Sequence, residues 1–292
     1  MSVGSAVMKT VRPHQWLKNA LVFVPLAAAH MMDDTARLLQ AMQCFAAFCL
    51  CASSLYVLND FLDRSADRLH PHKRERPLAA GSLSVPVALS LSVVLLLAAF
   101  AVAALLGFPM ILTLASYVVL MTAYSLGLKN IAMLDVLILA GGYALRVVAG
   151  GAAVRIAPSP WLVAFCVFLF LSLALVKRCA ELRLLRRHNG PTAHARGYQA
   201  GDETLLEVFG VASGYLSVLV LALYTSSAKV ERLYAHPQVI WLTCALLLYW
   251  LSHVWLTTHR GRMLDDPVLF ALRDPLSRAL VLLMGISAWT AV

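Results

Sequence analysis

Long apolar segments alternate with shorter polar ones along the whole chain. A transmembrane helix needs about 20 consecutive apolar residues, with a range of roughly 17 to 25. By this criterion the sequence predicts nine spans, at residues 16–32, 36–58, 85–107, 109–127, 133–155, 159–178, 205–228, 237–258 and 275–292. The pattern therefore predicts an all-α fold, a polytopic membrane bundle of nine transmembrane helices.

The polar segments are few, and the three long ones are residues 59–84, 179–204 and 259–274. Each of them follows an even-numbered predicted span, so all three are expected on one side of the membrane, as cap loops over the bundle. Residues 1–292 are therefore expected to form a single membrane-embedded domain without a soluble appendage.

The distribution of basic residues predicts the orientation, because cytosolic loops carry an excess of Lys and Arg. With a cytosolic N-terminus, the Lys and Arg residues expected outside are only Arg37, Arg155, Lys229 and Arg232. Trp16 and Lys18 run directly into the first apolar segment, which favours a mature helix over a cleavable signal peptide. We therefore expect a multi-pass protein of the cell inner (cytoplasmic) membrane, with its active site facing the cytosol.

Composition supports a lipid environment. The chain is 61% hydrophobic and 13% charged, whereas soluble domains are about 45–50% apolar and about 25% charged. The net charge of +9 lies in short loops between apolar segments, which indicates orientation and a phosphate-bearing substrate rather than nucleic acid. The six cysteines show no CxxC or metal-ligand spacing and are interpreted as small apolar fillers: Cys44, Cys49, Cys51, Cys166, Cys179 and Cys244.

The most informative polar motif is Asn59-Asp60-Phe61-Leu62-Asp63, followed by Asp67. Asn59, Asp63 and Asp67 recur every four residues, so they share one face if the second helix continues beyond the membrane. Carboxylates this close repel one another unless a cation lies among them, and oxygen ligands of this kind suit Mg²⁺ together with substrate phosphates. The alternative is an ordinary acidic, solvated helix end.

A basic run follows the acidic motif, from His70 through Lys73, Arg74 and Arg76 to Pro77. Acidic metal ligands followed by cations suit a magnesium–diphosphate group, because the cations neutralise the remaining phosphate charge. Positive-inside topology charges are the alternative for some of these residues. A tight turn is expected at Ala79-Ala80-Gly81.

Two ionisable residues lie in or beside the fifth predicted span, Asp135 and Arg146. Charged groups within a membrane span are costly unless paired or hydrated, so both are functional candidates, with a structural ion pair to another helix as the alternative. Tyr124 and Lys129 lie just before them.

Two further polar pairs have structural alternatives. Lys177 and Glu181 are four residues apart, as in an ordinary helix-surface pair. Asp265 and Asp266 precede Pro267, as helix N-caps do, and Arg273-Asp274 follows them. The sequence has no HExxH, GxSxG or P-loop motif, so zinc-dependent and hydrolytic functions have no support.

The motif Asn59-Asp60-x-x-Asp63-x-x-x-Asp67 resembles the first Asp-rich motif of the UbiA prenyltransferase superfamily. Further motifs resemble one branch, the decaprenyl-phosphate phosphoribosyltransferases. These motifs are Arg12-Pro13-His14-Gln15-Trp16-Leu17-Lys18-Asn19, His70-Pro71-x-Lys73-Arg74-x-Arg76-Pro77-x-Ala79-Ala80-Gly81, Leu145-Arg146-x-x-Ala149-Gly150-Gly151, Lys177-Arg178-x-Ala180-Glu181-Leu182 and Ala271-Leu272-Arg273-Asp274. The second Asp-rich motif of aromatic prenyltransferases is missing, because no aspartate lies between Asp135 and Asp202.

The resemblance implies nine transmembrane helices and transfer of 5-phosphoribosyl from phosphoribosyl diphosphate to a polyprenyl phosphate in the bilayer, with Mg²⁺ as cofactor. It implies that the product feeds the synthesis of an arabinan precursor for the cell envelope. Homo-oligomerisation is left open.

The resemblance also implies roles for individual residues. The expected magnesium ligands are Asn59, Asp60, Asp63 and Asp67. Asp60 or Asp135 is expected to stabilise an oxocarbenium-like transition state. The expected contacts to phosphate groups and to the rest of the substrates are Lys18, Asn19, Lys73, Arg74, Arg76, Tyr124, Lys129, Arg146, Lys177, Arg178 and Glu181.

Two rival functions remain. The first is prenyl transfer from a prenyl diphosphate to an aromatic or lipid acceptor, which shares the fold and the first motif. The second is transport of a lipid-linked or phosphorylated solute, which often involves inverted repeats and helices broken at the midplane. We detect no repeat, and the charged residues gather at one face.

Overall fold

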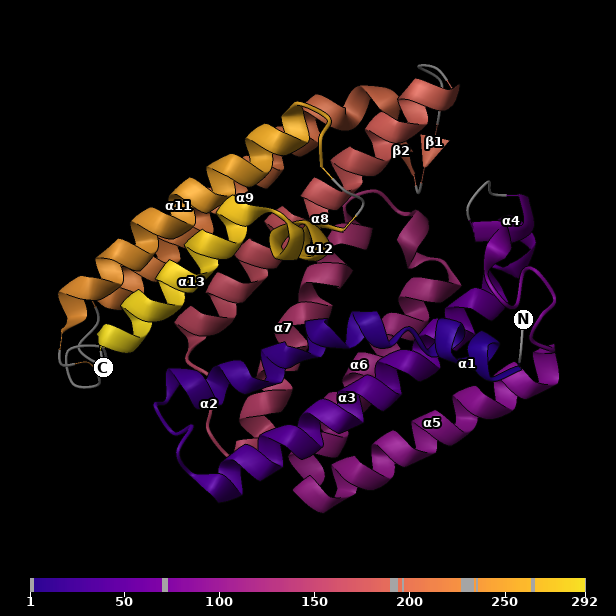
Figure 1. Ribbon diagram of the computed structural model, residues 1–292, viewed down its shortest axis with the longest axis horizontal. Helices are drawn as coiled ribbons and strands as arrows, with labels where there is room; N and C mark the ends of the chain where they lie inside the picture. The colour runs from indigo at the N-terminus through magenta and orange to yellow at the C-terminus, as the bar shows by residue number, and fades with distance from the viewer. Residues whose placement is uncertain are drawn as a thin grey trace. The chain divides into compact units, whose positions relative to one another are not determined.

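The computed structural model is almost entirely helical (Figure 1). It describes residues 3–69, 73–189, 194–195, 197–226, 234, 236–263 and 266–291. Backbone contacts divide the chain into two compact units, residues 1–129 with 145–158 and residues 130–144 with 159–292. Helix α7 (Leu134–Val154) contributes its first half to the second unit and its second half to the first.

The first unit is built around the long helix α3. Most of its other elements contact α3. The elements are α1 (Val3–Val11), η1 (Pro13–Phe23), α2 (Val24–Ala28), α3 (Thr35–Leu62), α4 (Arg64–Leu69), η2 (Lys73–Glu75), α5 (Val85–Leu106), α6 (Phe108–Leu126) and η3 (Leu128–Asn130), whose last residue belongs to the second unit.

Small side chains allow the helices of the first unit to approach closely. Cys44, Ala47 and Cys51 of α3 are fully buried in one cluster with Ala99 and Ala103 of α5. All six cysteines are free and buried, as the absence of a pairing motif predicts.

The second unit packs α8 (Pro160–Asn189) against α9 (Glu203–Thr225), and α11 (Pro237–His259) against α9 and α13 (Pro275–Thr290). Gly210 permits one of these contacts, because a Cβ atom there would lie 2.1 Å from the Trp255 ring. The remaining elements are η4 (Ala200–Asp202), α12 (Pro267–Arg273) and a two-stranded antiparallel hairpin, β1 (His194–Ala195) with β2 (Tyr198–Gln199). This hairpin is the departure from the predicted all-α fold.

Seven helices of the described residues are long and apolar enough to cross a membrane, and each overlaps one predicted span. They are α3, α5, α6, α7, α8 from Pro160 to Leu184, α9, and α11 from Gln238 to His259. The predicted last span corresponds to α13, a shorter apolar helix of 16 residues.

The predicted first span, residues 16–32, is not one continuous helix. An eleven-residue 3₁₀ helix, η1, ends at Phe23 and a five-residue α-helix, α2, follows it. Pro25 lies within the predicted span and lacks a backbone N–H, so a regular α-helix cannot run through this position with all its hydrogen bonds.

The three long polar segments, which were expected to form cap loops, contain helices. Residues 59–84 contain the end of α3, α4 and η2, residues 179–189 extend α8, and α12 lies within residues 259–274. Helix α1 precedes all of the predicted spans and has no counterpart among them.

Candidate active site

The Asp-rich motif lies where α3 ends and α4 begins. Asp63 is the C-cap residue of α3, and its backbone N–H donates to the Asn59 carbonyl at 2.9 Å. Helix α4 begins at the next residue, and the Asp67 N–H donates to the Asp63 carbonyl at 2.8 Å. The motif is therefore split between two helices joined at Asp63, rather than carried by one extended helix.

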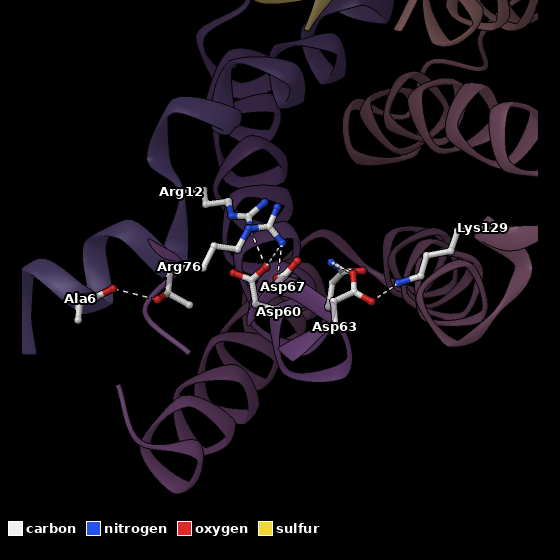
Figure 2. Close-up of polar contacts among 9 residues, drawn as sticks. Ala6, Arg12, Asp60, Asp63, Asp67, Arg76 and Lys129 are labelled. Atoms are coloured by element: carbon white, nitrogen blue, oxygen red, sulfur yellow. Dashed lines mark hydrogen bonds and ion pairs between the residues drawn. The ribbon is translucent and has the colours of Figure 1, made fainter. Parts of the chain in front are cut away.

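The side chains of the motif form two pairs (Figure 2). Asn59 Nδ2 donates to Asp63 Oδ2 at 3.1 Å. Arg76 Nη1 donates to both Asp60 Oδ1, at 3.1 Å, and Asp67 Oδ2, at 2.7 Å. The expectation that Asn59, Asp63 and Asp67 share one face needs correction, because Asp67 pairs through Arg76 with Asp60, seven residues away.

Two further cations complete the ion pairs of these carboxylates. Arg12 Nη2 lies 2.5 Å from Asp60 Oδ1, and Lys129 Nζ lies 2.5 Å from Asp63 Oδ1. The side chains of Asp60 and Asp67 are 2% and 5% exposed, whereas that of Asp63 is 29% exposed. Asp63 is therefore the carboxylate that a ligand from solvent reaches most readily.

Arg12 belongs to one of the sequence motifs, but its ion pair with Asp60 was not predicted. It connects α1 to η1 in a left-handed conformation, with φ 55° and ψ 60°, which is uncommon for a residue with a side chain. Its guanidinium carbon lies 5.1 Å from the centre of the Tyr56 ring. The unusual backbone directs this side chain to Asp60, a type of feature that clusters at functional sites.

The segment after η2 is held against α4 by two arginines. Arg64 Nε donates to the Leu78 carbonyl and Arg68 Nε to the Ala79 carbonyl, both at 3.2 Å. The expected tight turn is present, with Gly81 at φ +76°. Arg74 is exposed and Lys73 is partly exposed, while residues 70–72 of the predicted basic motif lie outside the described residues.

Arg146 lies in the interior of the first unit. Its Nε donates to Asn19 Oδ1 and its Nη2 to the Tyr117 hydroxyl, both at 2.8 Å. The Tyr117 ring also lies under the guanidinium, with 4.8 Å from Cζ to the ring centre. Arg146 and Asn19 thus join α7 to η1 in this structure, and Tyr117 is a partner that no sequence motif indicated.

Asp135 is the centre of a buried cluster in the second unit. Arg178 Nη2 lies 2.5 Å from Asp135 Oδ2, and both side chains are 0% exposed. The Tyr198 hydroxyl donates to Asp135 Oδ1 and accepts from the Met133 N–H at 2.8 Å. An ion pair between helices was the structural alternative for Asp135, and this is what the structure contains.

The remaining predicted residues are distributed over several elements. Glu181 pairs with Arg178, three residues before it on α8. Lys18, Tyr124 and Lys177 are partly exposed on η1, α6 and α8.

The capping role considered for Asp266 is present, because its side chain accepts from the Val268 N–H at 3.0 Å. Asp274 likewise accepts from the Ser277 N–H and caps α13. Asp265 lies outside the described residues.

The donor set of the Asp-rich motif fits a divalent cation. All its acidic and amide oxygens are hard ligands, and Asp60 and Asp67 already converge on one cationic nitrogen, Arg76 Nη1. Among the described residues, however, no three His, Cys, Asp or Glu side chains are grouped as a ready metal site. The residues that would hold a metal ion are Asn59, Asp60, Asp63 and Asp67, and two of them pair with Arg76 in this structure.

Residues 20–273 match the UbiA prenyltransferase family. The chain belongs to this family. A structure of a UbiA homolog from Archaeoglobus fulgidus bound to DMAPP and Mg²⁺ has a TM-score of 0.73 and 16% identity, covering 98% of this chain and 97% of that one. At this identity the likeness shows the fold, a UbiA-like helical fold of an integral membrane protein.

Sequence relatives extend the comparison within the UbiA family. Decaprenyl-phosphate phosphoribosyltransferase of Mycobacterium tuberculosis is 32% identical over 292 residues, covering 98% of this chain and 92% of that one. Nodulation protein NoeC of Azorhizobium caulinodans is 36% identical over 278 residues, covering 94% and 89%. Uncharacterized protein y4nM of Sinorhizobium fredii is 37% identical over 271 residues, which are 92% of this chain, but the chain spans only 52% of that relative's length.

Proposed function

We propose that this UbiA-family protein transfers 5-phosphoribosyl from phosphoribosyl diphosphate to a polyprenyl phosphate. The observation that carries the proposal is the cluster of Asp60, Asp63 and Asp67 with Arg12, Arg76 and Lys129. Such a cluster supplies oxygen ligands for a metal and cations for a diphosphate within one site. The relatives named decaprenyl-phosphate phosphoribosyltransferase, at 32–40% identity, support the choice of phosphoribosyl donor.

The roles of the residues follow from their chemistry. Asn59, Asp60, Asp63 and Asp67 would hold Mg²⁺, which when bound neutralises charge on the diphosphate leaving group. Arg76, with Lys73 and Arg74 from the same segment, would bind phosphate oxygens, because guanidinium groups match phosphate geometry. Lys129, which pairs with the partly exposed Asp63, is proposed to bind a second phosphate group.

The reaction needs no strong general base. One oxygen of the lipid phosphate, already anionic at neutral pH, forms a bond to the anomeric carbon of the ribose. The bond between that carbon and the diphosphate oxygen breaks, and diphosphate leaves with the electron pair. Binding would contribute alignment of the two reactants and neutralisation of the departing charge.

Topology and location are part of the proposal. We propose nine membrane crossings, with the N-terminus and the Asp-rich site on the cytosolic side of the inner membrane. The seven span-length helices would supply seven of these crossings, and the two shorter segments, η1–α2 and α13, would supply the other two. The concentration of Lys and Arg in segments that follow even-numbered spans supports this orientation.

Prenyl transfer is the second candidate. It is favoured by the UbiA homologs whose structures were solved with DMAPP or GPP and Mg²⁺. The absence of aspartate between Asp135 and Asp202 argues against it, because the aromatic prenyltransferases carry a second Asp-rich motif in that interval.

The proposal is tested with membranes that contain the full chain, Mg²⁺, a polyprenyl phosphate and labelled phosphoribosyl diphosphate. Label should enter the organic phase, and Asp67→Ala should lower the rate about 10²–10³-fold, as does removal of one preorganised electrostatic group. Asp33→Ala is the matched control, because Asp33 is an exposed carboxylate in the turn before α3. Equal rates for Asp67→Ala and the wild type would show that the site is assigned wrongly.

A further inference from the structure

The Asp-rich site is balanced in charge by the chain itself. Asp60, Asp63 and Asp67 contribute three negative charges, and three cations from separate segments pair with them. Arg12 comes from the junction of α1 and η1, Arg76 from the segment after η2, and Lys129 from η3.

These ion pairs use the oxygen atoms that a metal ion requires. Asp60 Oδ1 accepts from Arg12 at 2.5 Å and from Arg76 at 3.1 Å, while Asp67 Oδ2 accepts from Arg76 at 2.7 Å. A divalent ion bound between Asp60 and Asp67 would lie against the Arg76 guanidinium, and two cations in contact repel strongly away from bulk water. Metal binding at this position therefore requires the Arg76 side chain to leave.

The surroundings of Arg76 allow its side chain to move while its backbone stays in place. The Arg76 N–H donates to the Lys73 carbonyl at 3.0 Å, and its carbonyl accepts from the Ala80 N–H at 2.8 Å. The following residues are held by Arg64 and Arg68 of α4. The Arg76 side chain itself is 25% exposed, so it is not enclosed on all sides by the protein.

We propose that Arg76 is an exchangeable counter-ion that couples metal binding to diphosphate binding. It neutralises Asp60 and Asp67, and it yields these carboxylates to a divalent metal when a diphosphate offers it a replacement anion. The inference rests on the diphosphate part of the proposed function and holds for either donor, phosphoribosyl or prenyl diphosphate. When the metal binds alone, it displaces the Arg76 guanidinium from Asp60 and Asp67 without offering it another anion. When the metal binds with diphosphate, the guanidinium exchanges the two carboxylates for phosphate oxygens.

This coupling has a reciprocal thermodynamic signature. If diphosphate tightens the binding of the metal, then the metal tightens the binding of diphosphate by the same factor. The protein should thus bind Mg²⁺ weakly by itself and much more tightly with diphosphate. It would select the metal–diphosphate complex over either component.

Isothermal titration of the purified full chain in detergent tests the coupling, with Mg²⁺ and inorganic pyrophosphate as probes. Mg²⁺ is titrated alone and with pyrophosphate present, and the heat of forming Mg²⁺–pyrophosphate is subtracted with a protein-free titration. We expect pyrophosphate to tighten Mg²⁺ binding at least about tenfold, from the usual strength of hydrogen bonds between charged groups. Equal Mg²⁺ affinity under both conditions would overturn the proposal.

Variants of Arg76 identify the counter-ion. Arg76→Gln should tighten the binding of Mg²⁺ alone about tenfold and shrink the effect of pyrophosphate, while Arg76→Lys should restore the wild-type pattern. Arg37→Gln is the control, because it removes a positive charge whose ion pair with Asp34 lies outside the Asp-rich site. If Arg76→Gln and Arg37→Gln shift the Mg²⁺ affinity equally, Arg76 has no special role.

The outcome is distinguishable from that of the proposed function, because these titrations contain no phosphoribosyl or prenyl group. Coupled binding without phosphoribosyl transfer would support the counter-ion role of Arg76 and contradict phosphoribosyl diphosphate as the donor. Phosphoribosyl transfer without coupled binding would support the donor and contradict the counter-ion role.

Discussion

Tyr198 shows how one side chain can organise a buried charged cluster in this protein. Its hydroxyl lies between the Met133 N–H and the Asp135 carboxylate, and Asp135 in turn pairs with Arg178. The Tyr198 ring lies 5.6 Å from the Arg178 guanidinium carbon. Because a buried ion pair is costly unless its remaining hydrogen bonds are satisfied, Tyr198 stabilises the pair on which the start of α7 and the middle of α8 depend.

Tyr198 should make stability depend on alkaline pH. Burial, together with the hydrogen bond to Asp135, raises the pKa of Tyr198 above its ordinary value, which is about 10. Above about pH 10 the folded protein therefore keeps the Tyr198 proton while the unfolded chain loses it. The contribution of this hydroxyl to the free energy of unfolding is complete below about pH 10 and declines as the pH rises further.

Tyr198→Phe removes the hydroxyl and tests this dependence. We expect a loss of about 1–3 kcal/mol of stability near neutral pH, from two hydrogen bonds to buried groups. In thermal melts from pH 8 to pH 11, the gap between wild type and variant should narrow as the pH rises. A gap that is constant over this range would contradict the assigned role of the hydroxyl.

At the same scale, spacing predicted the acidic residues of the site but not their partners. Asn59, Asp60, Asp63 and Asp67 stand close together in the sequence, and their oxygen ligands suggested a metal at once. The partners Arg12 and Lys129 are 48 and 66 residues distant from Asp60 and Asp63. Only the packing of α1 and η3 near the end of α3 brings them together, so a single sequence could not assign these pairs.

Among the elements, the contact of η1 with α7 depends on a glycine. A Cβ atom at Gly150 would lie 2.0 Å from the Val22 carbonyl oxygen, a backbone atom that cannot rotate away. The same contact brings Asn19 of η1 to Arg146 of α7. The 3₁₀ helix is therefore held against α7 both by close backbone approach and by a buried polar pair.

Gly150→Ala should lower the melting temperature of the protein in detergent. Overpacking of a close contact costs about 1–3 kcal/mol, which exceeds the gain of up to about 1 kcal/mol from replacing glycine within a helix. Gly285→Ala in α13 is the matched control, because nothing lies within 4 Å of a Cβ atom there. An unchanged or higher melting temperature for Gly150→Ala would show that η1 does not approach α7 this closely.

Hydrophobic length predicted the seven span-length helices well, because each contains a long stretch of high mean hydropathy with few Asp, Glu, Lys or Arg residues. It did not predict that residues 16–32 divide into η1 and α2, because the average hydropathy hides Pro25 and the buried polar Asn19. The expected continuation of the second span past Asp63 and the capping role considered for Asp266 indicated helices in these polar segments, but not that α4 begins as a separate helix after Asp63.

For the whole molecule, the proposed nine crossings require η1 and α2 together to span the membrane. They place α1 inside the cell and the turn before α3 outside. Single cysteines at the exposed residues Lys9 and Asp33 report on the two sides. The six native cysteines are buried and should react slowly.

In spheroplasts with an intact inner membrane, an impermeant maleimide should label Asp33→Cys, and it should label Lys9→Cys only after that membrane is permeabilised. Unmodified protein reports the background of the native cysteines. Labelling of both positions only after permeabilisation would mean that residues 16–32 do not cross the membrane. One crossing, instead of two, would then precede α5, and the orientation would have to be reconsidered.

The identity of the transferred group separates the two candidate functions, and a competition between the two donors measures it. Membranes with the protein, Mg²⁺ and a polyprenyl phosphate receive ¹⁴C-labelled phosphoribosyl diphosphate and ³H-labelled prenyl diphosphate together, with an aromatic acceptor also present. We expect ¹⁴C in the lipid product, dependent on Mg²⁺ and abolished in Asp63→Ala, with no ³H joined to the aromatic acceptor. Transfer of ³H to that acceptor without ¹⁴C in the lipid would contradict phosphoribosyl transfer and establish prenyl transfer in its place.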